Sequence, residues 1–249
     1  MFAKEQVLFS PDSYHDTPFN RYAFKEELIG KAEKFYGVDV LTIARQIGVS
    51  AVGKESVRRV ADGILSCDKK TLKRANIYPK IYVVYPNSPK TAQHMSLPAF
   101  HMRDILTLDW WHCPFRKMLM QQEFLFMVFE NAEKKPKRRM DKNIIFKMAF
   151  YWKMPLDDIE EAYVVYEEVR RVVKQGIELY PTLNDLGKVI KGNNLPGPKD
   201  NRVCHVRPHG NPKTPEWLDD KRFMNQQSFW LNADYVQNII ASKSSDKLF

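Results

Sequence analysis

Two histidines and an arginine alternate along a short segment late in the sequence. His205, Arg207 and His209 stand two residues apart in the stretch CHVRPHG at 204–210. Because alternate side chains of a strand share one face, an extended conformation would present all three together. A guanidinium is a rigid fork of donors that matches a phosphate or the O6 and N7 atoms of guanine. The segment therefore indicates a nucleic-acid-binding face, the alternative being an arginine paired with an acidic neighbour beside two surface histidines.

A second segment, QQSFWLN at 226–232, combines side-chain amides with aromatic rings. The amides of Gln227 and Asn232 can hydrogen-bond the edges of bases, and Trp230 can stack on them. Burial in a core is the commoner position of aromatic side chains and is the alternative here. The pattern is compatible with either interpretation, a strand that reads bases or a strand of the core.

A strongly basic segment lies in the middle of the sequence. Its five cations are Lys134, Lys135, Lys137, Arg138 and Arg139. Such a loop would bind a phosphate backbone without reading its sequence, or would simply be a solvated loop. The whole chain has 39 Lys and Arg against 30 Asp and Glu, a net charge of +9, which favours a polyanionic partner such as nucleic acid.

The composition excludes several classes of protein. With 44% hydrophobic and 12% aromatic residues, the chain can bury a core and is not disordered throughout. The longest apolar run, 124–129, is far shorter than the ~18 residues of a membrane span, and no signal peptide is evident. Three scattered cysteines form neither a disulfide framework nor a Cys-x-x-Cys metal motif. We therefore expect a cytoplasmic protein without a cysteine-bound metal.

These candidate residues need strands and helices to position them. Amphipathic spacing, N-capping residues and terminal glycines predict helices over 21–35, 38–47, 54–65, 157–175 and 234–242. Residues of high β propensity predict strands over 77–87, 121–130, 144–151, 203–206 and 229–231. Pro79 suggests an edge strand or a bulge, and 181–198 suggests a long loop. The sum is a mixed α/β (α+β) fold with a central sheet.

Several of these segments, in the same order, resemble the MutH (DNA mismatch repair) and Sau-three-A-one family of GATC-directed nicking and restriction enzymes. HVRPHG at 205–210 and QQSFWLNADYV at 226–236 carry its C-terminal signature, 95–130 and 146–169 agree, and 19–50 agrees more loosely. The resemblance implies a restriction-endonuclease-like fold, a central mixed sheet flanked by helices, whose two arms form a DNA cleft. We expect an irregular lead-in at 1–18, one MutH-like DNA-binding domain with two sub-lobes at 19–242, and a tail at 243–249.

The resemblance also implies roles for individual residues. Arg207 would read guanine, Trp230 replaces an aromatic residue that approaches the bases, and His209 stands where a basic residue normally follows Arg-Pro. The family cleaves DNA with an Asp, six residues, then Glu-x-Lys, together with an upstream helical Glu, and these carboxylates hold Mg²⁺. In this sequence Lys80 remains, but Tyr78 stands in place of the Glu.

The other carboxylates of the catalytic pattern are also displaced. Thr71 stands at the Asp position with Asp68 three residues away, and only Glu27 or Glu33 could supply the helical carboxylate. The closest resemblance is thus to the C-terminal, catalytically degenerate effector domain of the GATC restriction enzyme.

The expected function is sequence-specific binding of double-stranded DNA at a GATC-like site, without a cofactor. The chain would be an excised C-terminal half or a separately encoded subunit, acting with a catalytic MutH-like nuclease domain or subunit. One alternative is an active Mg²⁺-dependent endonuclease whose carboxylates, drawn from Glu27, Glu33, Asp62 and Asp68, have rearranged beside Lys80. Another is a structural subunit that only docks a nuclease.

Overall fold

The computed structural model describes residues 19–53, 55–85, 93–131, 144–183, 187–209, 215–219 and 221–245. The expected lead-in at 1–18 and the basic segment Lys134, Lys135, Lys137, Arg138 and Arg139 lie outside these residues.

The first of two three-stranded sheets is mixed. Its order is β1 (Ile77–Val84), β3 (Glu123–Asn131) and β4 (Ile144–Trp152), with β1 parallel and β4 antiparallel to β3. Residues 124–129 of the central strand are all buried, which explains their unbroken apolar sequence. Pro79 lies in β1 at the edge of the sheet, as its missing amide proton requires.

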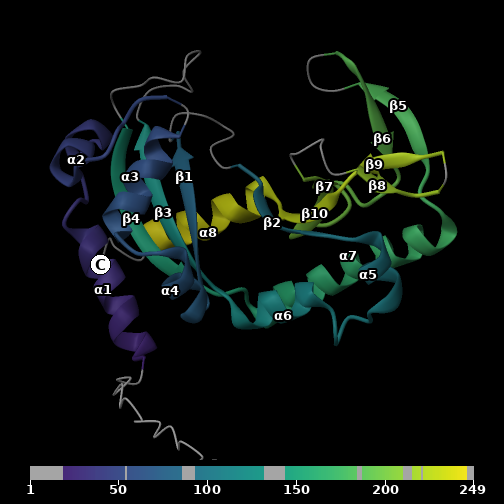
Figure 1. Ribbon diagram of the computed structural model, residues 1–249, viewed down its shortest axis with the longest axis horizontal. Helices are drawn as coiled ribbons and strands as arrows, with labels where there is room; N and C mark the ends of the chain where they lie inside the picture. The colour runs from purple at the N-terminus through teal and green to yellow at the C-terminus, as the bar shows by residue number, and fades with distance from the viewer. Residues whose placement is uncertain are drawn as a thin grey trace, which may run out of the picture.

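Four helices cover one face of this sheet and enclose a hydrophobic core with it (Figure 1). They are α1 (Arg21–Glu33), α2 (Val40–Ile47), α3 (Ser56–Leu65) and α4 (Lys69–Arg74). Local capping sets where they begin, because Asn20, Asp39 and Asp68 each accept backbone amide hydrogen bonds at the start of α1, α2 and α4. The short helix α4 is not among the helices that the sequence predicts.

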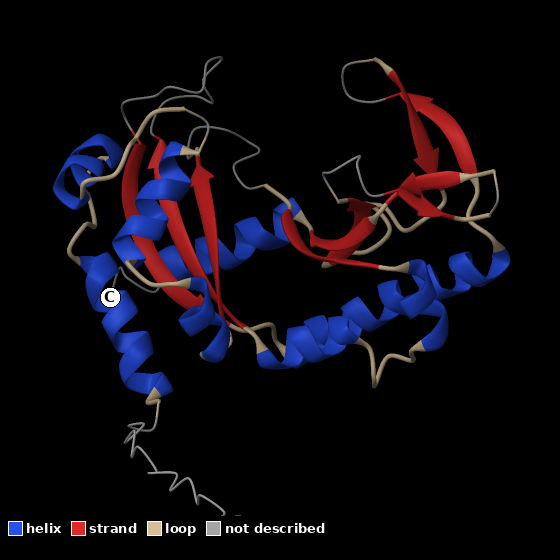
Figure 2. Ribbon diagram, in the orientation of Figure 1, coloured by secondary structure: helices blue, strands red, loops and turns tan. Residues whose placement is uncertain are grey.

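The second sheet is antiparallel, in the order β2 (Met95–Phe100), β10 (Gln227–Leu231) and β7 (Cys204–Pro208). Three helices flank it: α5 (Met102–Thr107), α6 (Pro114–Gln121) and α7 (Leu156–Gln175). One continuous core joins this sheet, α7 and the free face of the first sheet (Figure 2). The strands therefore form two sheets on a shared core.

The last helix, α8 (Ala233–Ser245), connects the two sheets. Its first amide, of Ala233, donates to Nδ1 of His94 beside the second sheet. Tyr235 donates its hydroxyl proton to Asp158 on α7, over 2.7 Å. Near the other end, Ser244 Oγ contacts the sulfur of Met148 in β4 at 4.0 Å. The tail expected at 243–249 is helical as far as Ser245.

We call the first sheet with α1 to α4 the first lobe, and the second sheet with α5 to α7 the second lobe. Two hairpins extend the second lobe: β5 (Leu179–Leu183) with β6 (Val189–Asn193), and β8 (Pro215–Trp217) with β9 (Phe223–Asn225). The loop predicted over 181–198 is thus wrong for its first part. The pairing depends on Gly192, since a Cβ there would lie 2.8 Å from the Tyr180 ring that crosses the ribbon.

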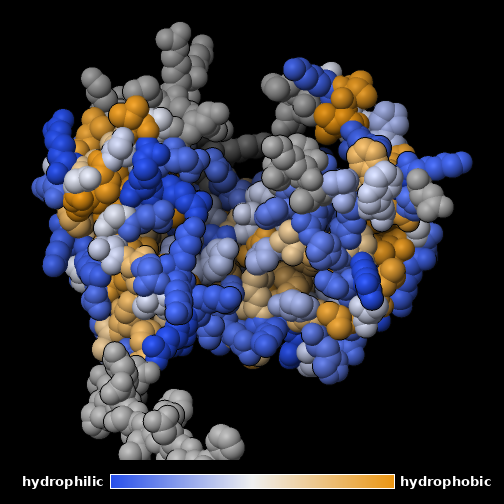
Figure 3. Space-filling view, in the orientation of Figure 1, coloured by the Kyte–Doolittle hydropathy of each residue, from blue (hydrophilic) through white to orange (hydrophobic). Residues whose placement is uncertain are grey.

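The mixed α/β prediction is confirmed, and the architecture is consistent with a restriction-endonuclease-like fold. Two lobes rise on either side of a notch, which the space-filling view shows as a hollow at the top of the molecule (Figure 3). No helix within the described ranges combines the length and apolarity that crossing a membrane requires.

Candidate nucleic-acid interface

The register of β7 and β10 decides which side chains share the outer face of the second sheet. Arg207 lies opposite Ser228, and His205 lies opposite Trp230. Phe229, between the two β10 residues, points to the other side and is buried in the core. The outer side of these two strands therefore carries His205, Arg207, Ser228 and Trp230, of which His205 and Ser228 are buried and Arg207 is exposed.

Arg207 and Trp230 form the centre of this face. The guanidinium carbon of Arg207 lies 5.7 Å from the centre of the Trp230 ring, which is within the range of a cation–π interaction. Arg207 is exposed, and no carboxylate of the described residues forms an ion pair with it. The acidic neighbour considered from the sequence is thus absent from the described part of the chain, and the guanidinium remains available to a ligand.

His209 extends the face beyond the end of β7. Its backbone amide donates to the carbonyl of Gln226 over 2.7 Å. Its Nδ1 lies 3.3 Å from Oγ of Ser228, the residue paired with Arg207. These contacts bring the half-buried imidazole beside the arginine, as the alternation along the sequence predicts.

His205 lies on the same side of the sheet as Arg207 and Trp230 but is buried, and Asn232, which follows β10, is buried beside it. His205 Nδ1 and Asn232 Oδ1 are 2.5 Å apart, and Asn232 donates its amide proton to the carbonyl of Asn201. Burial lowers the pKa of His205 to about 4, and the charges of His94 and Arg207 act in the same direction. Being neutral, His205 donates through Nδ1, which fixes the orientation of its ring.

Gln227 is also buried, on the core side of β10, where its side-chain amide donates to the carbonyl of Asn225. The sequence predicts that His205, Gln227 and Asn232 contact DNA, but all three side chains are buried. His205 is on the Arg207 side of the sheet, as the alternation predicts, whereas Gln227 is on the core side. Phe229 is a core residue, which was the alternative interpretation of this segment, since its ring stacks on that of Phe115 with 3.9 Å between the ring centres.

Burial of a neutral histidine makes stability depend on pH. Because the folded-state pKa of His205 is about 4 and the ordinary value is 6.5, the unfolded chain binds a proton that the folded chain does not as the pH falls from 6.5 to 4. We expect this histidine to cost about 2 kcal/mol of folding stability between pH 7 and pH 5. In urea denaturation, His205→Gln, which retains a donor for Asn232, should lose that much less than wild type; an equal loss in both proteins would contradict the prediction.

Lys80 of β1 reaches this face from the first sheet. Its Nζ donates to the carbonyl of Ser96 in β2 over 2.5 Å, and Ser96 is paired with Trp230. Burial lowers the pKa of Lys80 to about 8, and the charge of Arg58 on α3 adds to the effect. The lysine that the catalytic pattern retains is therefore beside the Trp230 face.

Comparison with known proteins adds a distant relative. The type II restriction enzyme Sau3AI of Staphylococcus aureus is 26% identical over 220 residues, an alignment that covers 72% of this chain. The chain is related to restriction endonucleases. The match spans 43% of the relative, so this chain corresponds to less than half of that protein. No protein-family model matches the chain.

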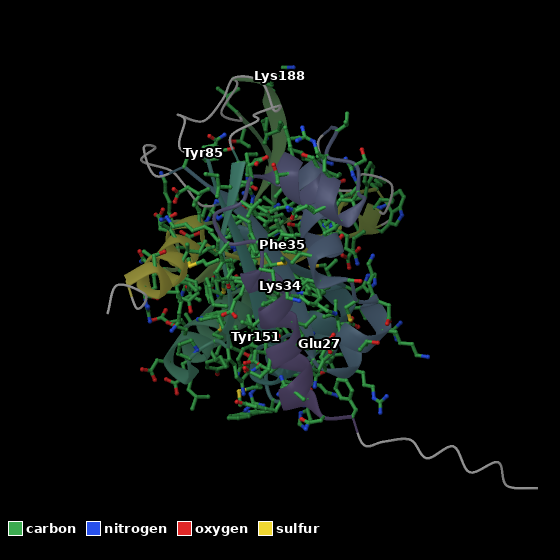
Figure 4. The ribbon with its side chains drawn as sticks, turned by 90° about the vertical axis from the view of Figure 1, so that its left-hand side faces the viewer. Glu27, Lys34, Phe35, Tyr85, Tyr151 and Lys188 are labelled. Atoms are coloured by element: carbon green, nitrogen blue, oxygen red, sulfur yellow. The ribbon has the colours of Figure 1, made fainter. Side chains whose placement is uncertain are left out.

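The carboxylates of the expected catalytic pattern have other partners. Glu27 pairs with Lys31 on α1 at 2.7 Å, and it lies on the outer side of the first lobe, which faces the viewer in Figure 4. Asp68 caps α4, accepting from the amides of Lys70 and Thr71. Glu33 is exposed at the end of α1.

Asp62, the remaining candidate, is exposed on α3 with Arg58 3.9 Å away. No group of three His, Cys, Asp or Glu in the described ranges could hold a metal ion together. Since Mg²⁺ requires several oxygen ligands in near-octahedral geometry, these residues do not fit the Mg²⁺ site of the family pattern.

Several residues of the interface had no distinctive sequence signal. Ser96, Ser228 and His94 are brought in by strand pairing and by the packing of His94 against His205, with ring centres 4.7 Å apart. Strand register depends on separate segments, which for β2 and β10 are more than a hundred residues apart, so local periodicity does not reveal it.

Proposed function

We propose that this chain binds double-stranded DNA in a sequence-specific manner, at a GATC-like site, through the outer face of its second sheet. The observation that carries the proposal is the exposed Arg207 guanidinium over Trp230, with His209 beside it. An arginine fixed on a strand can donate two hydrogen bonds to one guanine in the major groove. The indole provides an apolar surface for a base or a sugar.

The charge of the molecule supports a polyanionic ligand. The chain carries a net charge of +9, and Lys80 lies next to the proposed face. Phosphate contacts by such cations position a duplex without reading its sequence, which leaves discrimination to the Arg207 side chain. The basic segment at 134–139 would add such contacts in the proposal.

We further propose that the chain is a catalytically degenerate effector domain or subunit of a MutH-like type II restriction endonuclease. The dispersed carboxylates and the relation to less than half of a restriction enzyme support this role. DNA binding would need no cofactor, and cleavage would be performed by a catalytic MutH-like domain or subunit.

Fluorescence anisotropy of labelled duplexes tests the binding function. We expect tighter binding to a GATC duplex than to a scrambled duplex of equal length. The logarithm of the affinity should fall linearly with the logarithm of the salt concentration, by roughly 0.9 for each phosphate contacted. Equal affinities, or affinity independent of salt, would count against the proposal. Failure to bind any duplex would favour a structural subunit that only docks a nuclease.

The alternative function, an active Mg²⁺-dependent endonuclease, is tested with supercoiled plasmid. We expect the purified chain with Mg²⁺ to leave the plasmid uncut, because the candidate carboxylates do not converge beside Lys80. Asp68→Asn is the informative variant, since asparagine still caps α4 but is a weaker ligand for the cation. Nicking by wild type that this variant abolishes would establish the alternative.

A further inference from the structure

Gln226 stands between two histidines at the end of the second sheet. Gln227, the first residue of β10, pairs with the last residue of β2 and with the last residue of β7. His101 and His209 follow those two residues, so the same antiparallel register places Gln226 opposite both histidines. The hydrogen bond from the His209 amide to the Gln226 carbonyl continues this register.

Alternation places the Gln226 side chain on the same face as Arg207. Gln227 and Phe229 have buried side chains on the core side of β10, so the side chain of Gln226 points to the opposite side. Ser228 is paired with Arg207, which makes Gln226 the diagonal neighbour of Arg207, about 7–8 Å away. Gln226 is half-buried rather than enclosed, so its amide is accessible to a ligand that contacts Arg207.

The side-chain amide of Gln226 has unused hydrogen-bonding capacity. Its Nε2 lies 3.4 Å from both ring nitrogens of His101, one of which accepts a proton in the neutral imidazole. That contact uses one of the two N–H donors. The other N–H and the Oε1 acceptor have no partner among the residues that the structure describes. One donor and one acceptor, side by side in the plane of the amide, are therefore left for a ligand.

His101 is itself held in place beside Gln226. Glu216 of β8 accepts a hydrogen bond from the amide of Met102, the residue after His101. The carboxylate of Glu216 also lies 3.9 Å from Nδ1 of His101, and the Glu216 side chain is only 12% exposed. The imidazole held in this way restricts the rotamers of the Gln226 amide, which lowers the entropic cost of ordering that amide on a ligand.

A donor beside an acceptor on one amide matches the major-groove edge of adenine. Adenine presents the N7 acceptor next to the N6 amino donor, and glutamine can bind both at once, whereas guanine presents two acceptors at these positions. Successive base pairs are about 3.4 Å apart, so the separation of about 7–8 Å between Arg207 and Gln226 corresponds to one or two base-pair steps for side chains of this length. A GATC duplex has an adenine at each of these distances from its guanine, one on each strand.

We propose that Gln226 reads an adenine one or two base pairs from the guanine that Arg207 reads, by donating to N7 and accepting from the N6 amino group. The inference rests on the proposed DNA binding and names a second base contact of the same face. The sequence predicts this role for the neighbouring amide of Gln227, whose side chain is buried on the core side. The amide that reads the base is thus one residue earlier in the chain.

The test compares a GATC duplex with the same duplex in which 7-deazaadenine replaces both adenines. This base still pairs with thymine but lacks the N7 acceptor. In anisotropy measurements, wild type should bind the substituted duplex roughly tenfold more weakly, within the range that a bidentate contact contributes. Gln226→Ala keeps the backbone carbonyl that accepts from His209, so the strand pairing is retained. This variant should bind the natural duplex roughly tenfold more weakly than wild type does, and should bind both duplexes equally.

Two further variants separate base reading from a general loss of binding. Gln226→Glu keeps the size of the side chain but has no N–H donor, so it should also fail to distinguish the two duplexes. Gln121→Ala is the matched control, since Gln121 is an exposed glutamine at the end of α6. It should bind both duplexes as wild type does.

A preference for the natural duplex in Gln226→Ala as large as that of wild type would overturn the inference and leave the proposed DNA binding intact. The same conclusion would follow if wild type preferred GATC to a scrambled duplex but bound the natural and substituted GATC duplexes equally. Failure of the wild-type chain to prefer GATC to a scrambled duplex would remove the proposed function itself, together with the inference.

Discussion

Arg207→Ala is expected to weaken binding to a GATC duplex by about two orders of magnitude, ~3 kcal/mol, while hardly changing binding to a scrambled duplex. The exposed guanidinium, held over Trp230, is the proposed reader of guanine, and alanine would leave the base acceptors unpaired. Competition anisotropy with both duplexes measures the loss as a ratio of affinities. Discrimination equal to that of wild type would show that another residue reads the site.

A second substitution of Arg207 separates the loss of the planar guanidinium from the loss of charge, and a substitution elsewhere serves as the control. Arg207→Lys retains the positive charge but loses the planar fork, so it should keep the salt slope and still lose discrimination. Arg45, an exposed arginine on α2 outside the proposed face, provides the control. We expect Arg45→Ala to change affinity for the two duplexes equally, by less than about threefold.

Phe229→Ala is expected to cost about 3–5 kcal/mol of folding free energy, the largest effect on stability that we predict. The Phe229 ring stacks on Phe115 with 5° between the planes and lies 4.8 Å from the ring of Phe100. The three rings border a cavity of about 190 Å³. Removing one ring enlarges this pocket and leaves the facing rings without a packing partner, so relaxation recovers little of the lost packing. Urea denaturation at pH 7 measures the change.

Phe223→Ala serves as the matched control, since Phe223 is 46% exposed on β9. It should cost less than about 1 kcal/mol. Phe229→Leu keeps most of the volume and should lie between the two. A loss below 1 kcal/mol in Phe229→Ala would contradict a packed core beneath the proposed face.

The sequence predicted the elements whose signals are local. The apolar run at 124–129 predicts β3, and the acidic first turn and basic last turn around 157–175 predict α7 almost to the residue. Alternation also predicts that Arg207 and His209 lie together. Each of these signals depends only on neighbours within a turn or a strand.

What the sequence did not predict depends on distant contacts. The strands form two sheets because β2 and β7 pair with β10, which lies far from β2 along the chain. The sequence predicts a loop over 181–198 because Pro and Gly residues are typical of turns, whereas Gly192 lies within a strand, where it leaves room for the Tyr180 ring. The burial of His205 likewise requires His94 and Asn232, which come from other elements.

The helix α8 fixes the distance between the two sheets. It begins against His94 at the second sheet, ends against Met148 in the first, and is fastened midway by the shared core. Because α8 sets the separation of the two lobes before a ligand binds, a ligand that contacts both lobes would have to deform to fit. For a DNA duplex, whose stiffness varies with base sequence, the cost of this deformation would contribute to selectivity at base pairs that no side chain contacts.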